Sequence, residues 1–128
     1  MRKRHTDKLM SDPAYFRKTY AFENAQKRLD EAQKKATEQQ WKEAYLQLYK
    51  AFTIYVADRT NLSESGASDD EVMRRMESVY PEFKSKEEIR LFLKRCTTIS
   101  YAPGEGADSF DNDIAFIKKT LNELNQVK

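Results

Sequence analysis

The chain has little of what disulfide-linked, metal-binding or turn-rich proteins need. Its 128 residues include one cysteine, one histidine, three glycines and three prolines. The single cysteine, Cys96, excludes a disulfide within the chain, and together with His5 it offers no zinc-ligand spacing. The scarcity of glycine and proline, beside abundant Ala, Glu, Gln, Lys and Leu, favours helices over a turn-rich sheet protein.

Long apolar runs are also missing. The longest is residues 51–57, whereas about 18 to 20 apolar residues are needed to cross a bilayer. No apolar segment follows the basic start of the chain, which argues against a secretory signal peptide. At 12% aromatic residues the composition is nevertheless too aromatic for a disordered tail. A single domain with one hydrophobic core is expected at this length.

The net charge of +2 conceals an uneven distribution. Residues 1–60 carry 13 Lys or Arg against 8 Asp or Glu, and residues 61–128 carry 10 against 13. Much of the basic excess lies in Arg2, Lys3 and Arg4. Such clusters can bind phosphates, and they also concentrate just cytoplasmic of a membrane span.

We therefore expect residues 1–11 to be a basic, juxtamembrane-like stub and residues 12–128 to be the folded domain. In the stub, Arg2, Lys3, Arg4 and Lys8 are the candidate contacts to an anionic membrane surface, where each charge contributes about 1 kcal/mol.

Two long amphipathic segments open the folded part. Asp12 as N-cap and Pro13 at the first helical position predict the start of a helix, and apolar residues then recur at spacings of three and four to Ala36. A second, broader apolar surface runs from Trp41 to about Arg59 and predicts a central helix. Together the two segments predict a long antiparallel helical hairpin.

Three more helices are expected after a polar loop at residues 61–66. Two Ser-x-x-Glu sequences, at residues 68–71 and 85–88, predict capping boxes. The first helix should end before Pro81, and the second near Thr98. The last helix carries apolar residues from Phe110 to Leu124, with Asp108 or Ser109 as its cap. We predict an all-α, single-domain bundle of about five helices.

The chain has few candidates for chemistry. Asp111 and Asp113 resemble the start of a calcium loop, but the required glycine and final glutamate are absent, so an acidic helix N-terminus is the favoured interpretation. Cys96 lies on an apolar stripe, which favours a buried, inert thiol. Gly104-x-Gly106 lacks the rest of a dinucleotide or phosphate-binding motif. We therefore expect no catalytic residue, metal, cofactor or small-molecule substrate, and hence no enzyme.

Several short motifs resemble the C-terminal cytoplasmic region of BatD, the Bacteroides aerotolerance or oxygen tolerance family. They are the Asp-Pro-Ala-Tyr start at residues 12–15, the Tyr-x-Ala-Asp helix end at residues 55–58, and Cys-x(4)-Tyr-Ala-Pro-Gly at residues 96–104. The resemblance covers roughly residues 12 to 125. It implies the helical tail of an inner-membrane protein that has a large extracytoplasmic, β-rich region and one late transmembrane helix.

The resemblance also implies protein partners. Members of that family are encoded beside MoxR-type AAA+ ATPases and von Willebrand A-domain proteins, so a non-enzymatic docking domain is expected. The alternative is a free-standing soluble helical bundle that binds nucleic acid or acts as a regulatory adaptor. The core spacing of most aromatic residues disfavours a base-stacking platform, and we expect no nucleic-acid partner.

The family supplies no ligand residues to carry over, so the candidate partner-binding residues come from this sequence. They are Tyr101, Pro103 and Arg95, in and before the Ser-Tyr-Ala-Pro-Gly-Glu-Gly stretch of residues 100–106. That stretch is first of all a break between two helices, because Pro103 cannot continue a helix and Gly104 can take a positive φ. A partner-binding loop is the second interpretation.

Overall fold

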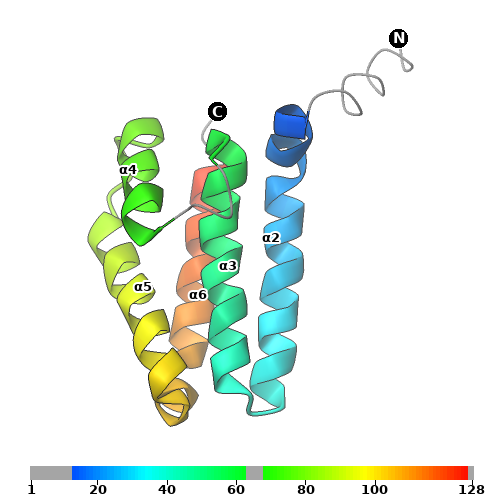
Figure 1. Cartoon of the computed structure of the whole chain (residues 1–128), viewed down its shortest axis with the longest axis vertical. Helices are drawn as coiled ribbons and strands as arrows, with labels where there is room; N and C mark the ends of the chain where they lie inside the picture. The colour runs from blue at the N-terminus through cyan, green and yellow to red at the C-terminus, as the bar shows by residue number, and fades with distance from the viewer. Residues whose placement is uncertain (1–12, 63–67, 127–128) are drawn as a thin grey trace.

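In the computed structural model the described residues are 13–62 and 68–126, and they form five α-helices and one short 3-10 helix, with no strand (Figure 1). The predicted all-α bundle is therefore confirmed. The elements are α2 (Pro13–Thr37), α3 (Trp41–Thr60), α4 (Asp69–Val79), α5 (Lys86–Tyr101), η1 (Pro103–Glu105) and α6 (Gly106–Asn125).

The predicted Asp12 cap and the stub contacts of Arg2, Lys3, Arg4 and Lys8 lie outside the described residues. Within the described residues, none of the helices combines the length and the apolar character that a bilayer crossing requires.

The predicted N-terminal hairpin is confirmed by α2 and α3, which run side by side in opposite directions (Figure 1). Alanines allow the close approach, since a methyl side chain keeps the two backbones near each other. The turn between the helices places Gln39 in the left-handed region, at φ 60°. There Gln39 N–H donates to the Ala36 carbonyl and Gln40 N–H to the Lys35 carbonyl, which is a Schellman ending. The buried alanines of the two helices are Ala21, Ala25, Ala32, Ala36, Ala44, Ala51 and Ala57.

Helix α3 is the central element, as its broad apolar surface predicted. It contacts α2, α4, α5 and α6, so it is covered on several sides. Its largest buried side chains are Tyr45, Phe52 and Tyr55. The core that surrounds it is continuous through the whole bundle, so the described helices pack around one helix rather than as two separate pairs.

The two predicted capping boxes behave differently. Ser68 caps α4, since its Oγ accepts a hydrogen bond from Glu71 N–H at 3.2 Å, while the Glu71 carboxylate pairs with Arg74. Ser85 precedes α5 as predicted but makes no side-chain cap bond. The second box is therefore wrong. Ser85 has ψ 28°, whereas a capping residue typically has extended backbone.

Helix α5 ends later than predicted, at Tyr101 rather than near Thr98. The chain breaks at Ala102, with φ −134° and ψ 73°, because the residue before a proline is disfavoured in the α conformation. Pro103 then begins η1. The predicted positive φ at Gly104 is wrong, since no glycine of the described residues has one. The structural break itself is confirmed.

Helix α6 begins at Gly106, and not after a cap at Asp108 or Ser109 as predicted. A Cβ at Gly106 would lie 3.0 Å from Trp41 Cβ and 3.2 Å from Tyr45 Cε2. Glycine is therefore needed because the start of α6 presses directly on α3.

The early start of α6 moves Asp111 and Asp113 beyond its first turn. Our interpretation of this acidic pair as a helix N-terminus was wrong for that reason.

Candidate functional site

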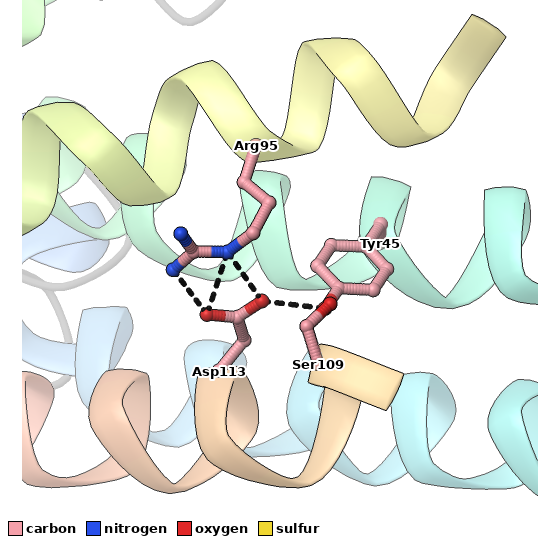
Figure 2. A network of polar contacts seen from close by, with 4 residues as sticks. All are labelled: Tyr45, Arg95, Ser109 and Asp113. Carbon is pink, nitrogen blue, oxygen red and sulfur yellow. Dashed lines mark hydrogen bonds and ion pairs between the residues drawn. The ribbon is translucent and has the colours of Figure 1, made fainter. Parts of the chain in front are cut away.

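A polar network joins α3, α5 and α6 around the buried carboxylate of Asp113 (Figure 2). Asp113 is only 2% exposed. Arg95 donates to it in a fork, with Nε 2.9 Å from Oδ2 and Nη2 2.5 Å from Oδ1. From the opposite side Tyr45 Oη donates to Oδ2 at 2.5 Å.

Ser109 completes this network. Its Oγ lies 2.6 Å from Tyr45 Oη, and the single phenol proton is already directed at Asp113. The Ser109 hydroxyl is therefore the donor in this contact. Among the described residues no buried side-chain nitrogen or oxygen lacks a hydrogen-bond partner, so the network is closed.

Burial controls the protonation of this network. Loss of solvent, and next the hydrogen bond to Asp113, raise the pKa of Tyr45. The hydrogen bond to Asp113 likewise raises the pKa of Arg95. Tyr45 thus remains a neutral phenol and Arg95 a cation at physiological pH. The two groups hold a buried carboxylate and join three helices, and neither is prepared to act as a base or nucleophile.

Tyr45 also lines an open groove between α3 and α5, which we call the α3–α5 groove. Its volume is about 200 Å³. The network therefore holds the wall of this groove in place, since Tyr45 takes part in both. The lining residues are Lys42, Tyr45, Leu46, Tyr49, Cys96, Thr97 and Ser100.

A second groove, the α4–α5 groove, lies on the other side of α5. It measures about 420 Å³ and shares Thr97 with the first. Tyr49 lines the first groove and Asp69 the second, and Tyr49 Oη donates to Asp69 Oδ1 at 2.5 Å, which joins α3 to the start of α4. Acidic and basic residues both line it, among them Asp69, Asp70, Glu87, Arg90 and Lys94.

The predicted partner-binding residues fall into two groups. Tyr101 is the last residue of α5 and is 86% exposed, and Pro103 is exposed in η1. Arg95 is different, because its guanidinium forks onto the buried carboxylate of Asp113, while the arginine side chain itself is 41% exposed. The structure thus brings Arg95 to the buried network and leaves Tyr101 at the surface.

The sequence analysis did not identify Asp113 as a structural residue, although its spacing from apolar neighbours indicates that it is buried. Asp113 follows Phe110 by three residues and precedes Ile117 by four, which places a carboxylate on the apolar face of its helix. Asp58 likewise follows the apolar-face residue Tyr55 by three positions. It is buried on α3 and accepts from Arg17 Nε at 2.9 Å.

The predicted burial of the Cys96 thiol is confirmed, because the residue is 7% exposed. Burial, and then the nearby Asp113 carboxylate, raise the pKa of the thiol, which leaves it protonated and unreactive at neutral pH. In the parts of the chain that the structure describes, no group of three His, Cys, Asp or Glu side chains is placed to hold a metal ion.

Comparison of the chain with protein-family models, with curated proteins and with solved structures yields no match.

Proposed function

We propose that the chain is a non-enzymatic protein-interaction domain. On this proposal it is the cytoplasmic tail of a membrane-anchored, inner-membrane protein similar to the BatD family, and it docks a MoxR-type AAA+ ATPase or a von Willebrand A-domain protein. The sequence motifs support the family and the partners. The observation that carries the docking role is the apolar surface around α5.

Three large apolar side chains are exposed on this surface, which we call the α5 surface. Leu46 is 46% exposed, Leu91 51% and Tyr101 86%. Leu46 and Leu91 line the two grooves that share Thr97, and Tyr101 follows Thr97 by one helical turn. Leu46 and Leu91 thus border two neighbouring grooves, and Tyr101 lies at the C-terminal end of the same helix α5. Exposed apolar residues beside grooves are a feature of interaction sites.

The buried network supports a docking role because it holds this surface in one shape. Arg95 of α5 is fixed to α6 through Asp113, and Asp113 is fixed to α3 through Tyr45. A partner that binds a rigid surface loses less free energy to ordering than one that binds a mobile loop. In addition, aromatic residues such as Tyr101 are enriched among the side chains that dominate binding energy.

A binding experiment with matched variants tests the proposal. The full chain is immobilised and exposed to a MoxR-type ATPase and to von Willebrand A-domain proteins from the organism that encodes it, and dissociation constants are measured. We expect Tyr101→Ala to weaken binding about tenfold, as truncation of a central aromatic contact does. Phe16→Ala removes a 49% exposed aromatic from α2 and should leave binding unchanged.

The proposal is wrong if none of these proteins binds, or if the α2 variant weakens binding as much as the α5 variant. A complex with nucleic acid that weakens steeply as salt rises would instead favour the regulatory or nucleic-acid alternative.

The membrane part of the proposal has its own test. If Arg2, Lys3, Arg4 and Lys8 contact anionic lipid, the chain should sediment with vesicles that contain phosphatidylserine, and 0.5 M salt should release it. Removal of residues 2–8 should abolish sedimentation. Unchanged vesicle binding after that deletion contradicts the juxtamembrane role.

A further inference from the structure

We infer that the α3–α5 groove binds an amphipathic helix of the partner through one inserted apolar side chain flanked by carboxylates. This inference rests on the proposed docking function and deepens it, since it names the site on this chain and the chemistry of the segment that fills it.

The size of the groove fits a side chain better than a free ligand. Its volume is about 200 Å³. A cavity of about 150 Å³ already accommodates benzene, whereas pockets for drug-sized molecules span roughly 300 to 1,000 Å³. One Leu, Met or Phe side chain therefore has room, and it would contact Tyr45, Leu46 and the Cys96 thiol.

The shape of the groove fits a helix. Its α3 wall extends from Lys42 to Tyr49, which is about 10 Å at 1.5 Å per residue. That length matches two turns of a helix that presents apolar residues at positions i, i+3 or i+4, and i+7. The described residues contain no strand, and hence no sheet edge to which an extended peptide could add.

The positive charge at the groove favours a partner helix that carries negative charge. Lys42 is the only charged residue among those that line it, and in the described part of the chain no ion pair occupies Lys42. Arg95, the residue before the lining Cys96, is paired with Asp113. A carboxylate on the incoming helix would pair with Lys42, whereas a lysine there would meet a like charge.

Synthetic peptides test this chemistry without the natural partner. The probes are fluorescein-labelled helices of 18 residues with the same leucine face and with either glutamate or lysine at all flanking positions. Binding to the full chain is measured by fluorescence anisotropy at 50 mM salt. We expect the glutamate peptide to bind about fivefold more tightly, the effect of exchanging one exposed ion pair for a repulsion.

Variants of exposed residues assign the site. Lys42→Glu should reverse the preference between the two peptides, whereas Lys50→Glu, on the same helix but outside the lining, should not. Leu46→Asp should weaken both peptides by about tenfold or more, and Leu91→Asp, in the α4–α5 groove, should not. Circular dichroism establishes that each variant is folded.

The inference is overturned if the glutamate peptide does not bind, if Lys42→Glu leaves the preference unchanged, or if backbone amide shifts in NMR map the peptide to the α4–α5 groove. It is also overturned if the chain alone dimerises and Leu46→Asp abolishes that dimer, because a second copy then occupies the groove.

Failure of the groove inference can be distinguished from failure of the proposed function. Partner binding that survives Leu46→Asp refutes the groove and keeps the docking domain. Peptide binding without capture of either predicted partner refutes their identity and keeps the groove.

Discussion

Asp58 and Asp113 are buried carboxylates that arginines from other helices hold in place. Asp58 of α3 accepts from Arg17 of α2, and Asp113 of α6 accepts from Arg95 of α5. A buried ion pair contributes little compared with a well-packed apolar pair, but removing one partner is costly because the other charge stays buried. At the scale of single residues, these pairs join α2 to α3 and α5 to α6.

Arg95 donates more of the side-chain hydrogen bonds to the Asp113 carboxylate than Tyr45 does. Arg95→Met keeps the aliphatic packing and leaves the carboxylate with only the Tyr45 hydroxyl. We expect a loss of about 2 to 4 kcal/mol in the free energy of unfolding, measured by urea denaturation. Lys94→Met, at the exposed neighbour, should cost less than about 0.5 kcal/mol. Equal effects of the two variants would mean that the fork onto Asp113 contributes nothing.

The two glycines near the end of α5 have different roles and give a second prediction. Gly106→Ala places a Cβ against Trp41 and Tyr45 and should destabilise the fold by about 1 to 3 kcal/mol through overpacking. Gly104→Ala enters open space and should be neutral or stabilise by up to about 1 kcal/mol. Thermal unfolding of both variants compares them. The close approach of α6 to α3 is refuted if Gly106→Ala is as stable as the wild type.

At the scale of elements, the helix starts show how backbone geometry overrides a motif. Residues 68–71 and 85–88 have the same Ser-x-x-Glu pattern. Ser68 has extended backbone and its hydroxyl caps α4, whereas the turn after Pro81 brings Ser85 to ψ 28°, where its side chain makes no cap bond. For these two helices the sequence therefore placed the start but not the hydrogen bonds that cap it.

The difference between these two serines is measurable. Ser68→Ala removes a real cap and should cost about 1 kcal/mol, whereas Ser85→Ala should change stability by less than about 0.5 kcal/mol. Urea denaturation of the two variants measures both changes in the free energy of unfolding. If Ser85→Ala is the more damaging substitution, the two helix starts have been assigned the wrong way round.

At the scale of the whole molecule, buried phenols make stability depend on alkaline pH. Loss of solvent on burial raises the pKa of Tyr45, Tyr49, Tyr55 and Tyr80 above the ordinary value of 10.0. Below pH 10 both the folded and the unfolded chain keep these protons. Above pH 10 the unfolded chain loses them first, so the unfolded state binds fewer protons and folding becomes less favourable as pH rises.

We therefore expect the free energy of unfolding to be flat near neutral pH and to fall above pH about 10, by up to about 1.4 kcal/mol per pH unit for each buried phenol. Urea denaturation between pH 8 and 11.5 measures this slope. Tyr45→Phe should make the slope shallower, because it removes one of the phenols whose pKa burial raises. A wild-type slope that stays flat to pH 11.5 contradicts the burial of these hydroxyls.

Much of the architecture could be predicted from apolar spacing alone. The hairpin of α2 and α3, the central position of α3 and the end of α4 before Pro81 all follow from local patterns that tertiary packing does not oppose. The first turn of α6 could not be predicted, because glycine at position 106 is unfavourable for a helix locally and is accepted only for its contact with α3.

The sequence by itself determined that this chain forms helices and which face of each helix is buried, because spacing and helix propensity act over a few neighbouring residues. Only the tertiary structure decided which polar residues belong to the interior and where apolar side chains remain exposed. Arg95 and Asp113 are 18 residues apart, and Leu46 and Thr97 lie on different helices. Such pairs come into contact only when α3, α5 and α6 pack together. The spacing of apolar residues along one helix does not predict contacts between residues of different helices.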